Sequence, residues 1–408
     1  MDSEMAAMDR PNVFEYVPAS TVPVGVKVIS CRWVFKIKPD KYKARLVIRG
    51  FMQDEATIEG GTFSPVKFVT VRLLFALAAM TGWMVQQMDV CNAFLNADLP
   101  TDAPIFMRCV DGYLYPGYVI KLRKALYGLK NSPREWYKTL RAHLLSLNLV
   151  QCALDACLFM LVINSKTVLL KTVGCHVDDL IIVGVTVHVM RFKQQMTDKF
   201  KMEDLGYPDK CLGMDIDYLD SGSIQLRQTT YIEKLLHRFN LAAGKEKSTP
   251  MDTNLKLSAT DVPKDDEELP RFPYRELVMS LLYLAIATRP DICYPVKELS
   301  RFMARPGVKM VIAAKRVLRY LGKTKHLGLI YHCVPRTVLG GLFATSFETP
   351  VSAFSDASWA DRLDDRKSTA GMVLLFNGTA IMWWSTSCGG ARSCALSRAH
   401  LKMLSSWR

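Results

Sequence analysis

Residues 83–90 read WMVQQMDV, an apolar run with an acid just before its last residue. Thr81 and Gly82 precede this run and separate it from residues 71–80, whose composition predicts a buried helix. The run itself predicts a short strand, and residues 92–99 predict a second helix. Asp89 therefore has two interpretations: a carboxylate presented near the end of a strand, or the N-cap of the helix that follows.

Two further apolar runs, residues 168–175 and 180–187, are rich in β-branched residues and bracket the pair Asp178-Asp179. This pattern predicts a β-hairpin. An aspartate pair at a tight turn is often structural, because Asp tolerates turn geometry. Here the apolar flanks place the carboxylates close to a core, where a buried carboxylate needs a cation. If the strand of Asp89 pairs beside this hairpin, the carboxylates meet in a site suited to Mg²⁺, a hard ion that takes oxygen ligands.

Length and charge set the broad class of the protein. The chain has 408 residues, 50% of them hydrophobic, which is enough for two or three domains with their own cores. Lys and Arg total 53 against 39 Asp and Glu, so the formal net charge is +14. This excess favours a polyanionic partner such as nucleic acid, although a soluble surface can also be basic without one.

Cysteine usage and hydropathy indicate the compartment. The 11 cysteines form no C-x-x-C pair, and no His cluster has zinc-ligand spacing, which favours a reducing environment. The chain does not open with a basic segment followed by an apolar one, as a secretory signal does. The apolar stretches near residues 73–85 and 180–190 are too short or too interrupted to cross a bilayer. We therefore expect an intracellular protein that is not secreted and has no membrane partner.

A basic hairpin is expected near the N-terminus. Residues 32–38 alternate basic and apolar side chains, and residues 43–48 resume a strand after Pro39-Asp40. The segment has one acid and the following cations: Arg32, Lys36, Lys38, Lys41, Lys43, Arg45 and Arg49. It suits an arm that contacts phosphates, and a solvated basic ribbon over a core is the alternative.

The rest of the chain is read mainly as helices. Ser132-Pro133 is expected to cap and open a helix over residues 134–147. Residues 231–241 place apolar side chains on one helical face, and residues 243–270 are polar enough for a solvated linker. Further helices are expected near residues 274–287, 295–303 and 310–321, and strands over residues 351–384.

Several motifs together resemble the core of copia-type retrotransposon reverse transcriptases. The central ones are QMDVCNAFL (87–95), ALYGLKNSPR (125–134) and HVDD (176–179). The same order and spacing continue on both sides, in KARLV (43–47), TFSPV (62–66), EDLG (203–206), STPM (248–251), TRPD (288–291), AAKRVLRYL (313–321) and FSDASWA (354–360). The similarity covers nearly the whole chain.

This resemblance implies an α+β fold in three parts. Residues 1–241 would form the fingers, palm and thumb of a right-hand polymerase. Residues 242–345 would form a linker and a helical connection region, and residues 346–408 an incomplete ribonuclease H-like α/β fragment.

The resemblance also implies RNA-directed DNA polymerase activity. Asp89 and Asp178 would hold two Mg²⁺ ions, with Mn²⁺ as an alternative, while Asp179 assists and the Val90 carbonyl adds a ligand. One ion lowers the pKa of the primer 3′-hydroxyl, and the other neutralises the triphosphate. The substrates would be dNTP, a DNA primer and an RNA or DNA template.

Five residues are expected around the nucleotide. Phe94 would lie beneath the incoming sugar and exclude a 2′-hydroxyl, although a core phenylalanine fits the same position. Lys43 and Arg45 would clamp the triphosphate, and Tyr127 and Gly128 would line the pocket. By the same resemblance, other retrotransposon polyprotein products are candidate partners, and the location is a cytoplasmic virus-like particle or the nucleus.

The ribonuclease H part departs from the family. Asp356 resembles its first catalytic carboxylate, but residues 395–401 read ALSRAHL where relatives read ALSSTEAEY, and the chain stops at Arg408. One aspartate cannot hold a metal pair, so we expect no ribonuclease H activity. His176 in place of Tyr and the short turn at Pro39-Asp40 are smaller departures.

Two alternatives to the polymerase stay open. One is a catalytically inactive retroelement relic that at most binds nucleic acid through the basic hairpin. The other is an unrelated two-metal nuclease or nucleotidyltransferase.

Overall fold

The computed structural model describes residues 1–8, 12–37, 42–53, 66–163, 166–173, 178–264, 269–333, 351–360 and 362–388. The chain divides into two units. Unit 1 contains residues 1–66 and 86–207, and unit 2 contains residues 67–85 and 208–408. In the described part of the chain, no helix combines the length and the apolar character that crossing a membrane requires.

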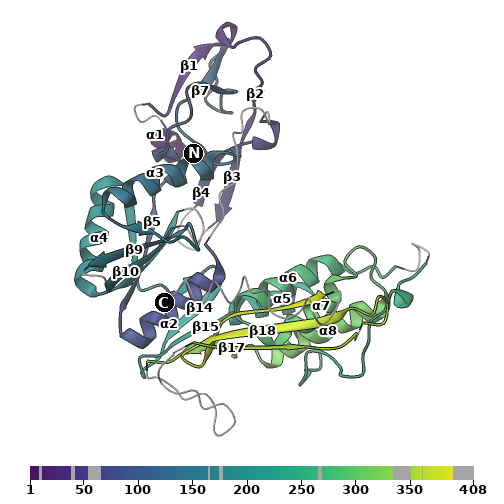
Figure 1. Ribbon diagram of the computed structural model, residues 1–408. Helices are drawn as coiled ribbons and strands as arrows, with labels where there is room; N and C mark the ends of the chain where they lie inside the picture. The colour runs from purple at the N-terminus through teal and green to yellow at the C-terminus, as the bar shows by residue number, and fades with distance from the viewer. Residues whose placement is uncertain are drawn as a thin grey trace. The chain divides into compact units, whose positions relative to one another are not determined.

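Unit 1 is built around a six-stranded sheet in the order β12-β5-β11-β10-β9-β8. Helix α4 packs against strands β10 and β11, and α3 packs against the short helix η4 (Figure 1). The elements are β5 (Met84–Val90), η4 (Ala93–Asn96), α3 (Ser132–Ser146), β8 (Val150–Gln151), β9 (Leu158–Ile163), β10 (Lys166–Val173), β11 (Asp179–Gly184), α4 (Thr186–Lys199) and β12 (Met202–Gly206).

The predicted hairpin around the aspartate pair is confirmed. Strands β10 and β11 pair in antiparallel fashion, with Leu170 opposite Val183. Every residue of β11 after Asp179 is buried, as expected for an apolar run inside a sheet that is covered on both faces. Residues 174–177, which include His176, lie outside the described residues.

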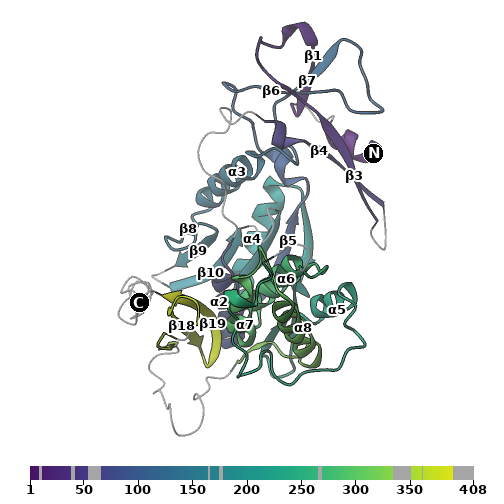
Figure 2. The ribbon, with the colours of Figure 1, turned by 90° about the vertical axis from the view of Figure 1, so that its right-hand side faces the viewer.

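The N-terminal part of unit 1 adds a four-stranded sheet in the order β1-β7-β6-β2 and the two-stranded ribbon β3-β4 (Figure 2). The predicted basic hairpin is confirmed, because β3 and β4 pair in antiparallel register. Lys38, Pro39, Asp40 and Lys41 lie outside the described residues. The elements are α1 (Asp2–Met8), β1 (Phe14–Pro18), η1 (Ala19–Thr21), β2 (Val28–Ile29), β3 (Cys31–Ile37), β4 (Tyr42–Ile48), η2 (Gly50–Met52), β6 (Ile105–Met107) and β7 (Tyr118–Leu122).

The core of unit 2 is helical. Helices α5 to α8 share one buried cluster, so the helix expected over residues 231–241 packs with the three helices expected after it. Figure 1 shows strands β17 and β18 running alongside these helices. The helices are α2 (Phe68–Thr81), α5 (Thr229–Arg238), η5 (Ala259–Asp261), α6 (Tyr274–Ala287), η7 (Pro290–Ile292), α7 (Cys293–Ser300) and α8 (Val308–Lys323).

Two sheets complete unit 2. One has the order β13-β14-β15-β16 and the other the order β17-β18-β19. The second confirms the strands expected over residues 351–384. The strands are β13 (Lys210–Cys211), β14 (Met214–Tyr218), β15 (Ile224–Arg227), β16 (Leu329–Tyr331), β17 (Val351–Ala357), β18 (Ser368–Phe376) and β19 (Thr379–Cys388).

Two local predictions were wrong. Residues 92–99 form only the single 3₁₀ turn η4, because Asn92 is left-handed (φ 52°) and Asp98 already bridges to Lys124. Ser132 does not cap α3: its hydroxyl donates to the Leu126 carbonyl oxygen (2.6 Å), and no side chain caps that helix. The first error arises where a bridge to a residue distant in the sequence outweighs local helix propensity, and the second where the Ser132 hydroxyl bonds to the preceding loop instead of the helix.

The segment 243–270 is less solvated than its composition predicts. Leu257 is buried in the helical core, and the hydroxyl of Ser258 accepts a hydrogen bond from the Thr260 N–H at the start of η5 (3.2 Å). Residues 265–268 lie outside the described residues. The described part of this segment is therefore anchored to unit 2.

Candidate functional site

Asp89 and the aspartate pair lie on neighbouring strands. Strand β5 carries Asp89 next to its last residue, and β11 begins at Asp179 and lies beside β5 in the sheet. The Val90 N–H donates to the Asp178 carbonyl oxygen (3.0 Å), which brings the ends of the two strands together. The predicted juxtaposition is confirmed. The N-cap interpretation of Asp89 was wrong, because the N-cap position of η4 is occupied by Asn92.

The period-2 geometry of β5 selects which side chains reach the site. Gln87 and Asp89 are partly exposed, whereas Met88 and Val90 are buried on the other face of the strand. From its position on the open face, the Gln87 side-chain amide donates to Asp179 Oδ1 (3.1 Å). The alternation of side chains along β5 therefore places Asp89 and the Gln87 amide, which orients Asp179, on the same face of the strand.

Asp178 is oriented by a residue from a distant motif. The Tyr127 hydroxyl donates to Asp178 Oδ2 (3.1 Å). The backbone holds Tyr127 in place, since the Ile48 N–H donates to the Tyr127 carbonyl oxygen (2.8 Å). This close approach requires glycine at the next position: Gly128 has φ +97°, and a Cβ there would overlap the Ile48 carbonyl oxygen. The close packing at Gly128 thus positions the Tyr127 hydroxyl to bind Asp178.

Burial and neighbouring acids raise the pKa of two of the aspartates, Asp89 and Asp178. Burial raises the pKa of Asp89 to about 6, and the negative charges of Asp178, Asp179 and Glu203 add to the shift. Burial also raises the pKa of Asp178; the Tyr127 hydrogen bond opposes this rise, and Asp179 adds to it. Like charges held together out of water would be relieved by a bound cation.

Two cations of the basic hairpin act on the same acids. The charge of Lys43 lowers the pKa of Asp89, and that of Arg45 lowers the pKa of Asp178, although both effects are smaller than the effect of burial. The Arg45 guanidinium carbon also lies 5.1 Å from the centroid of the Tyr127 ring. Both hairpin residues expected at the nucleotide therefore lie close enough to act on the aspartates.

Phe94 completes an aromatic pair beside the acids. Its ring packs edge-on against Tyr127, with 4.6 Å between the centroids. Phe94 is only 5% exposed, so its ring packs as a core side chain does while contacting a residue that touches Asp178. The structure thus brings all the expected residues of unit 1 into one neighbourhood.

The donor set has the chemistry of a hard-cation site. The three side chains are carboxylates, and they repel one another. Among the described residues, no group of three or more His, Cys, Asp or Glu side chains is arranged as it stands to hold a metal ion. The hydrogen bonds indicate why, because Asp178 is turned to Tyr127 and Asp179 to Gln87. An incoming cation would have to compete with these partners.

Sequence reasoning missed two contributors to this site. Gln87 belongs to a recognised motif, but its amide was not assigned to Asp179. Glu203 lies directly opposite Asp89 on β12 and adds to its raised pKa. The motif EDLG was a signal for Glu203, but only the pairing of β12 with β5 places its acid beside Asp89.

Asp356 has a different environment. It is exposed on β17, opposite Gly371 of β18, and its carboxylate accepts a hydrogen bond from the backbone N–H of Ala357 (2.8 Å). No metal-binding group that includes it is found in the described part of the chain. Residues 395–401, where the sequence departs from the family, lie outside that part.

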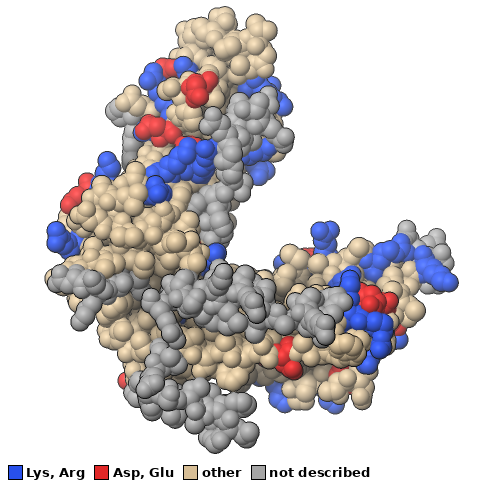
Figure 3. Space-filling model, in the orientation of Figure 1, with Lys and Arg blue, Asp and Glu red and all other residues tan. Residues whose placement is uncertain are grey.

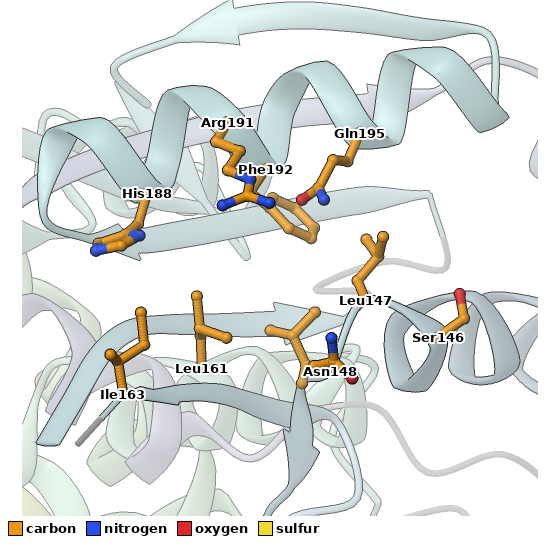
Figure 4. Close-up of a pocket in the computed structure, with 10 residues that line it drawn as sticks. Ser146, Leu147, Asn148, Leu161, Ile163, His188, Arg191, Phe192 and Gln195 are labelled. Atoms are coloured by element: carbon orange, nitrogen blue, oxygen red, sulfur yellow. The ribbon is translucent and has the colours of Figure 1, made fainter. Parts of the chain in front are cut away.

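A cavity of ≈ 220 Å³ lies elsewhere in unit 1, between α4 and β9. Figure 4 shows His188, Arg191 and Gln195 of α4 on one side, with Leu161 and Ile163 of β9 facing them. None of the residues expected at the catalytic or nucleotide site lines it.

Comparison with known proteins places the chain in a family. Residues 12–253 match the family described as "Reverse transcriptase (RNA-dependent DNA polymerase)". The chain is 34% identical over 401 residues to the retrovirus-related Pol polyprotein from transposon TNT 1-94 of Nicotiana tabacum. It is 36% identical over 399 residues to that from transposon RE1 of Arabidopsis thaliana. Each match covers 94% of this chain but only 29% and 25% of the respective relative.

The chain thus spans between a quarter and a third of the length of these curated relatives. A solved foamy viral protease-reverse transcriptase in complex with RNA/DNA hybrid is 11% identical, with a TM-score of 0.47. That match covers 100% of this chain and 46% of the solved one. On the sequence matches, the chain belongs to the reverse transcriptase (RNA-dependent DNA polymerase) family, as its resemblance to copia-type polyproteins predicted.

Proposed function

We propose that the chain is an RNA-directed DNA polymerase that joins a dNTP to a primer 3′-hydroxyl on an RNA or DNA template. The observation that carries the proposal is the meeting of Asp89 with Asp178 and Asp179 at the ends of neighbouring strands, where burial and the charges of the other two raise the pKa of Asp89. Perturbed carboxylates at one point are typical of catalytic sites, and membership of the family adds the reaction class.

The metal ligands of the proposed mechanism are residues of unit 1. Asp89 and Asp178, with the Val90 carbonyl, would hold two Mg²⁺ ions or Mn²⁺, and Asp179 would add negative charge beside them. The ions supply activation of the 3′-hydroxyl and neutralise the triphosphate. Tyr127 would release Asp178 when a cation binds, because one carboxylate oxygen now accepts its hydroxyl.

The neighbours of the acids suit a nucleotide. Arg45 and Lys43 bring positive charge to the position where a triphosphate would meet the acids. Tyr127 and Gly128 would line the pocket, and Phe94 beside Tyr127 would restrict the sugar at its 2′ position.

The wider assignments follow from the family. We propose fingers, palm and thumb over residues 1–241, a connection region over 242–345 and a ribonuclease H-like fragment over 346–408 without nuclease activity. An RNA template and a DNA primer would be the macromolecular partners, together with other products of the retrotransposon polyprotein.

Primer extension on an RNA template with Mg²⁺ or Mn²⁺ tests the proposal. The parent chain should extend the primer, and Asp178→Asn should not. Asp198→Asn, an exposed acid on α4 that bonds to Gln194, is the matched control and should behave as the parent. Equal extension by parent and Asp178→Asn would remove the site assignment.

Failure of a well-folded parent to extend the primer would favour the second candidate, a relic that only binds nucleic acid. The basic ribbon β3-β4 favours that candidate, and Figure 3 shows Lys and Arg side chains at the surface of each unit. Binding that weakens steeply with salt, without extension in either metal, is its signature.

A further inference from the structure

Helix α2 contains a buried cation with an unusual set of partners. Arg72 is 4% exposed, and burial lowers its pKa to about 10. No carboxylate pairs with it among the described residues of unit 2. Its guanidinium instead donates to three carbonyl oxygens, those of Ile381 (2.7 Å), Ile286 (2.6 Å) and Ala287 (2.9 Å). A buried charge without an acid depends on every one of these contacts.

Two of the acceptors are carbonyl oxygens at the C-terminal end of helix α6. Ile286 and Ala287 are its last residues, and the carbonyls of a final helical turn have no partner within the helix. A cation at this end is favoured by the helix dipole. The side chain of Arg72, which belongs to α2, therefore caps the C-terminus of α6.

Strand β19 supplies a further contact of Arg72 besides the Ile381 carbonyl. The Trp383 ring centroid lies 3.9 Å from the guanidinium carbon, a close cation–π contact. The Trp383 indole N–H donates to the carbonyl oxygen of Ala285 (2.7 Å), which is also in the last turn of α6. One tryptophan thus covers the arginine and binds the same helix end.

A second group of contacts holds the loop between β17 and β18. The Asp364 carboxylate accepts hydrogen bonds from the Ser258 hydroxyl (2.6 Å) and the Ala259 N–H (2.9 Å), and it contacts Arg301 of α7. Lys297 of the same helix donates to the hydroxyl of Thr369 in β18 (2.7 Å). The sheet β17-β18-β19 is therefore held by its loop as well as by the Arg72 and Trp383 contact.

We propose that the sheet β17-β18-β19 is a bound structural partner of α2, α6 and α7. In this role the ribonuclease H-like fragment acts by binding within unit 2, independently of any nuclease chemistry and of the proposed polymerase activity. Loss of the sheet would leave Arg72 buried without the Trp383 ring and the Ile381 carbonyl, and would leave the Ala285 carbonyl at the end of α6 without the Trp383 indole. Because dissociation would cost these contacts, we expect the sheet to stay bound even when its covalent link to the rest of the chain is cut.

The test cuts that link in the full chain. A specific protease site is inserted between residues 334 and 350, the purified protein is cleaved, and the products are separated by gel filtration at decreasing concentration. The C-terminal fragment should co-elute with the remainder. Trp383→Leu should weaken this association by at least about ten-fold, because it removes the cation–π contact with the buried Arg72 and a partly buried hydrogen bond.

The matched control is Trp384→Leu, the next residue on the same strand, which points to the opposite side of the sheet. It should leave co-elution unchanged. Arg72→Lys keeps the charge but loses the planar fork, and should weaken association less than Arg72→Met. Where Arg72→Met fails to fold, Trp383→Phe serves in its place, since it keeps a ring but loses the indole N–H.

Two results would overturn the proposal. One is separation of the fragment from the cleaved parent at micromolar concentration. The other is equal release by Trp383→Leu and Trp384→Leu. Neither readout involves nucleotide or template, so failure here leaves the polymerase proposal standing, and failure of primer extension leaves this one standing.

Discussion

Asp89 and Asp356 are both aspartates on strands that the sequence marks as parts of two-metal sites, yet their surroundings differ. Asp89 lies on a strand with neighbours on both sides, and three other acids act on its pKa. Asp356 lies on β17, an outer one of the three described strands of its sheet, and is exposed to solvent. An aspartate becomes part of a candidate metal site when the neighbouring strands bring further acids to the same point. Its position within the sheet decides whether such neighbours are present.

The difference follows from sheet geometry. The neighbour β12 places Glu203 directly opposite Asp89 of β5, and the other neighbour, β11, begins at Asp179. On β17 the described neighbour is β18, whose residue opposite Asp356 is Gly371. Asp89 is therefore repelled by neighbouring acids, whereas Asp356 is exposed to water.

The largest expected effect compares the two acids directly. Asp89→Asn should reduce primer extension by at least about a hundred-fold, since removal of a metal-binding carboxylate removes transition-state stabilisation. Asp356→Asn should leave extension within about two-fold of the parent, because substitution of an exposed surface residue usually has a small effect. Initial rates at saturating dNTP measure both. Similar losses in the two variants would break the comparison.

A smaller effect is expected from the hydrogen bond to Asp178. Tyr127→Phe keeps the ring that packs against Phe94 but frees Asp178 Oδ2. The Mg²⁺ concentration for half-maximal extension should fall by about three- to ten-fold, as a hydrogen bond to a charged group is worth about 1.5–3 kcal/mol when buried and less here. Tyr137→Phe, whose hydroxyl donates to the Ala156 carbonyl oxygen, is the control. An unchanged or higher Mg²⁺ requirement would contradict the competition between Tyr127 and metal.

The raised pKa of Asp89 predicts a stability effect in metal-free protein. Because the folded-state pKa lies near 6 and the usual pKa of an aspartate is 3.8, this group favours folding below about pH 4, and that benefit is lost as pH rises through 6. Asp89→Asn should therefore stabilise the protein at pH 8 by about 1 kcal/mol, after allowance for screening of a partly exposed group.

Urea unfolding with EDTA at pH 5 and pH 8 measures this effect. The gain from Asp89→Asn should be larger at pH 8 than at pH 5. A variant that is less stable than the parent at pH 8 would show that Asp89 is a net stabilising group in the fold.

The smallest effect belongs to the exposed acid. Asp356→Asn should change the free energy of unfolding by no more than about 0.5 kcal/mol, as is usual for surface substitutions away from caps and networks. The same urea titrations serve as the measurement. A larger loss would indicate that Asp356 has partners beyond the Ala357 N–H.

Secondary structure was predicted correctly where a single period runs through a whole segment. The strand of Asp89, the hairpin of the aspartate pair and the helix over residues 274–287 were predicted correctly, because each rests on a run of residues with one clear period. The prediction of a helix over residues 92–99 was wrong. There, the left-handed Asn92 and the bridge from Asp98 to Lys124 redirect the chain, and neither is visible in local composition.

By itself, the sequence determined the family, the acids and the strands that carry them, since these depend on residue identity and on periodicity along short segments. Only the tertiary structure decided which partners those residues have. The bond from Tyr127 to Asp178 spans 51 positions, and the bond from Arg72 to Ile381 spans 309. Contacts at such separation depend on how whole sheets and helices pack, because burial and hydrogen-bond satisfaction are properties of the folded chain and not of any segment within it.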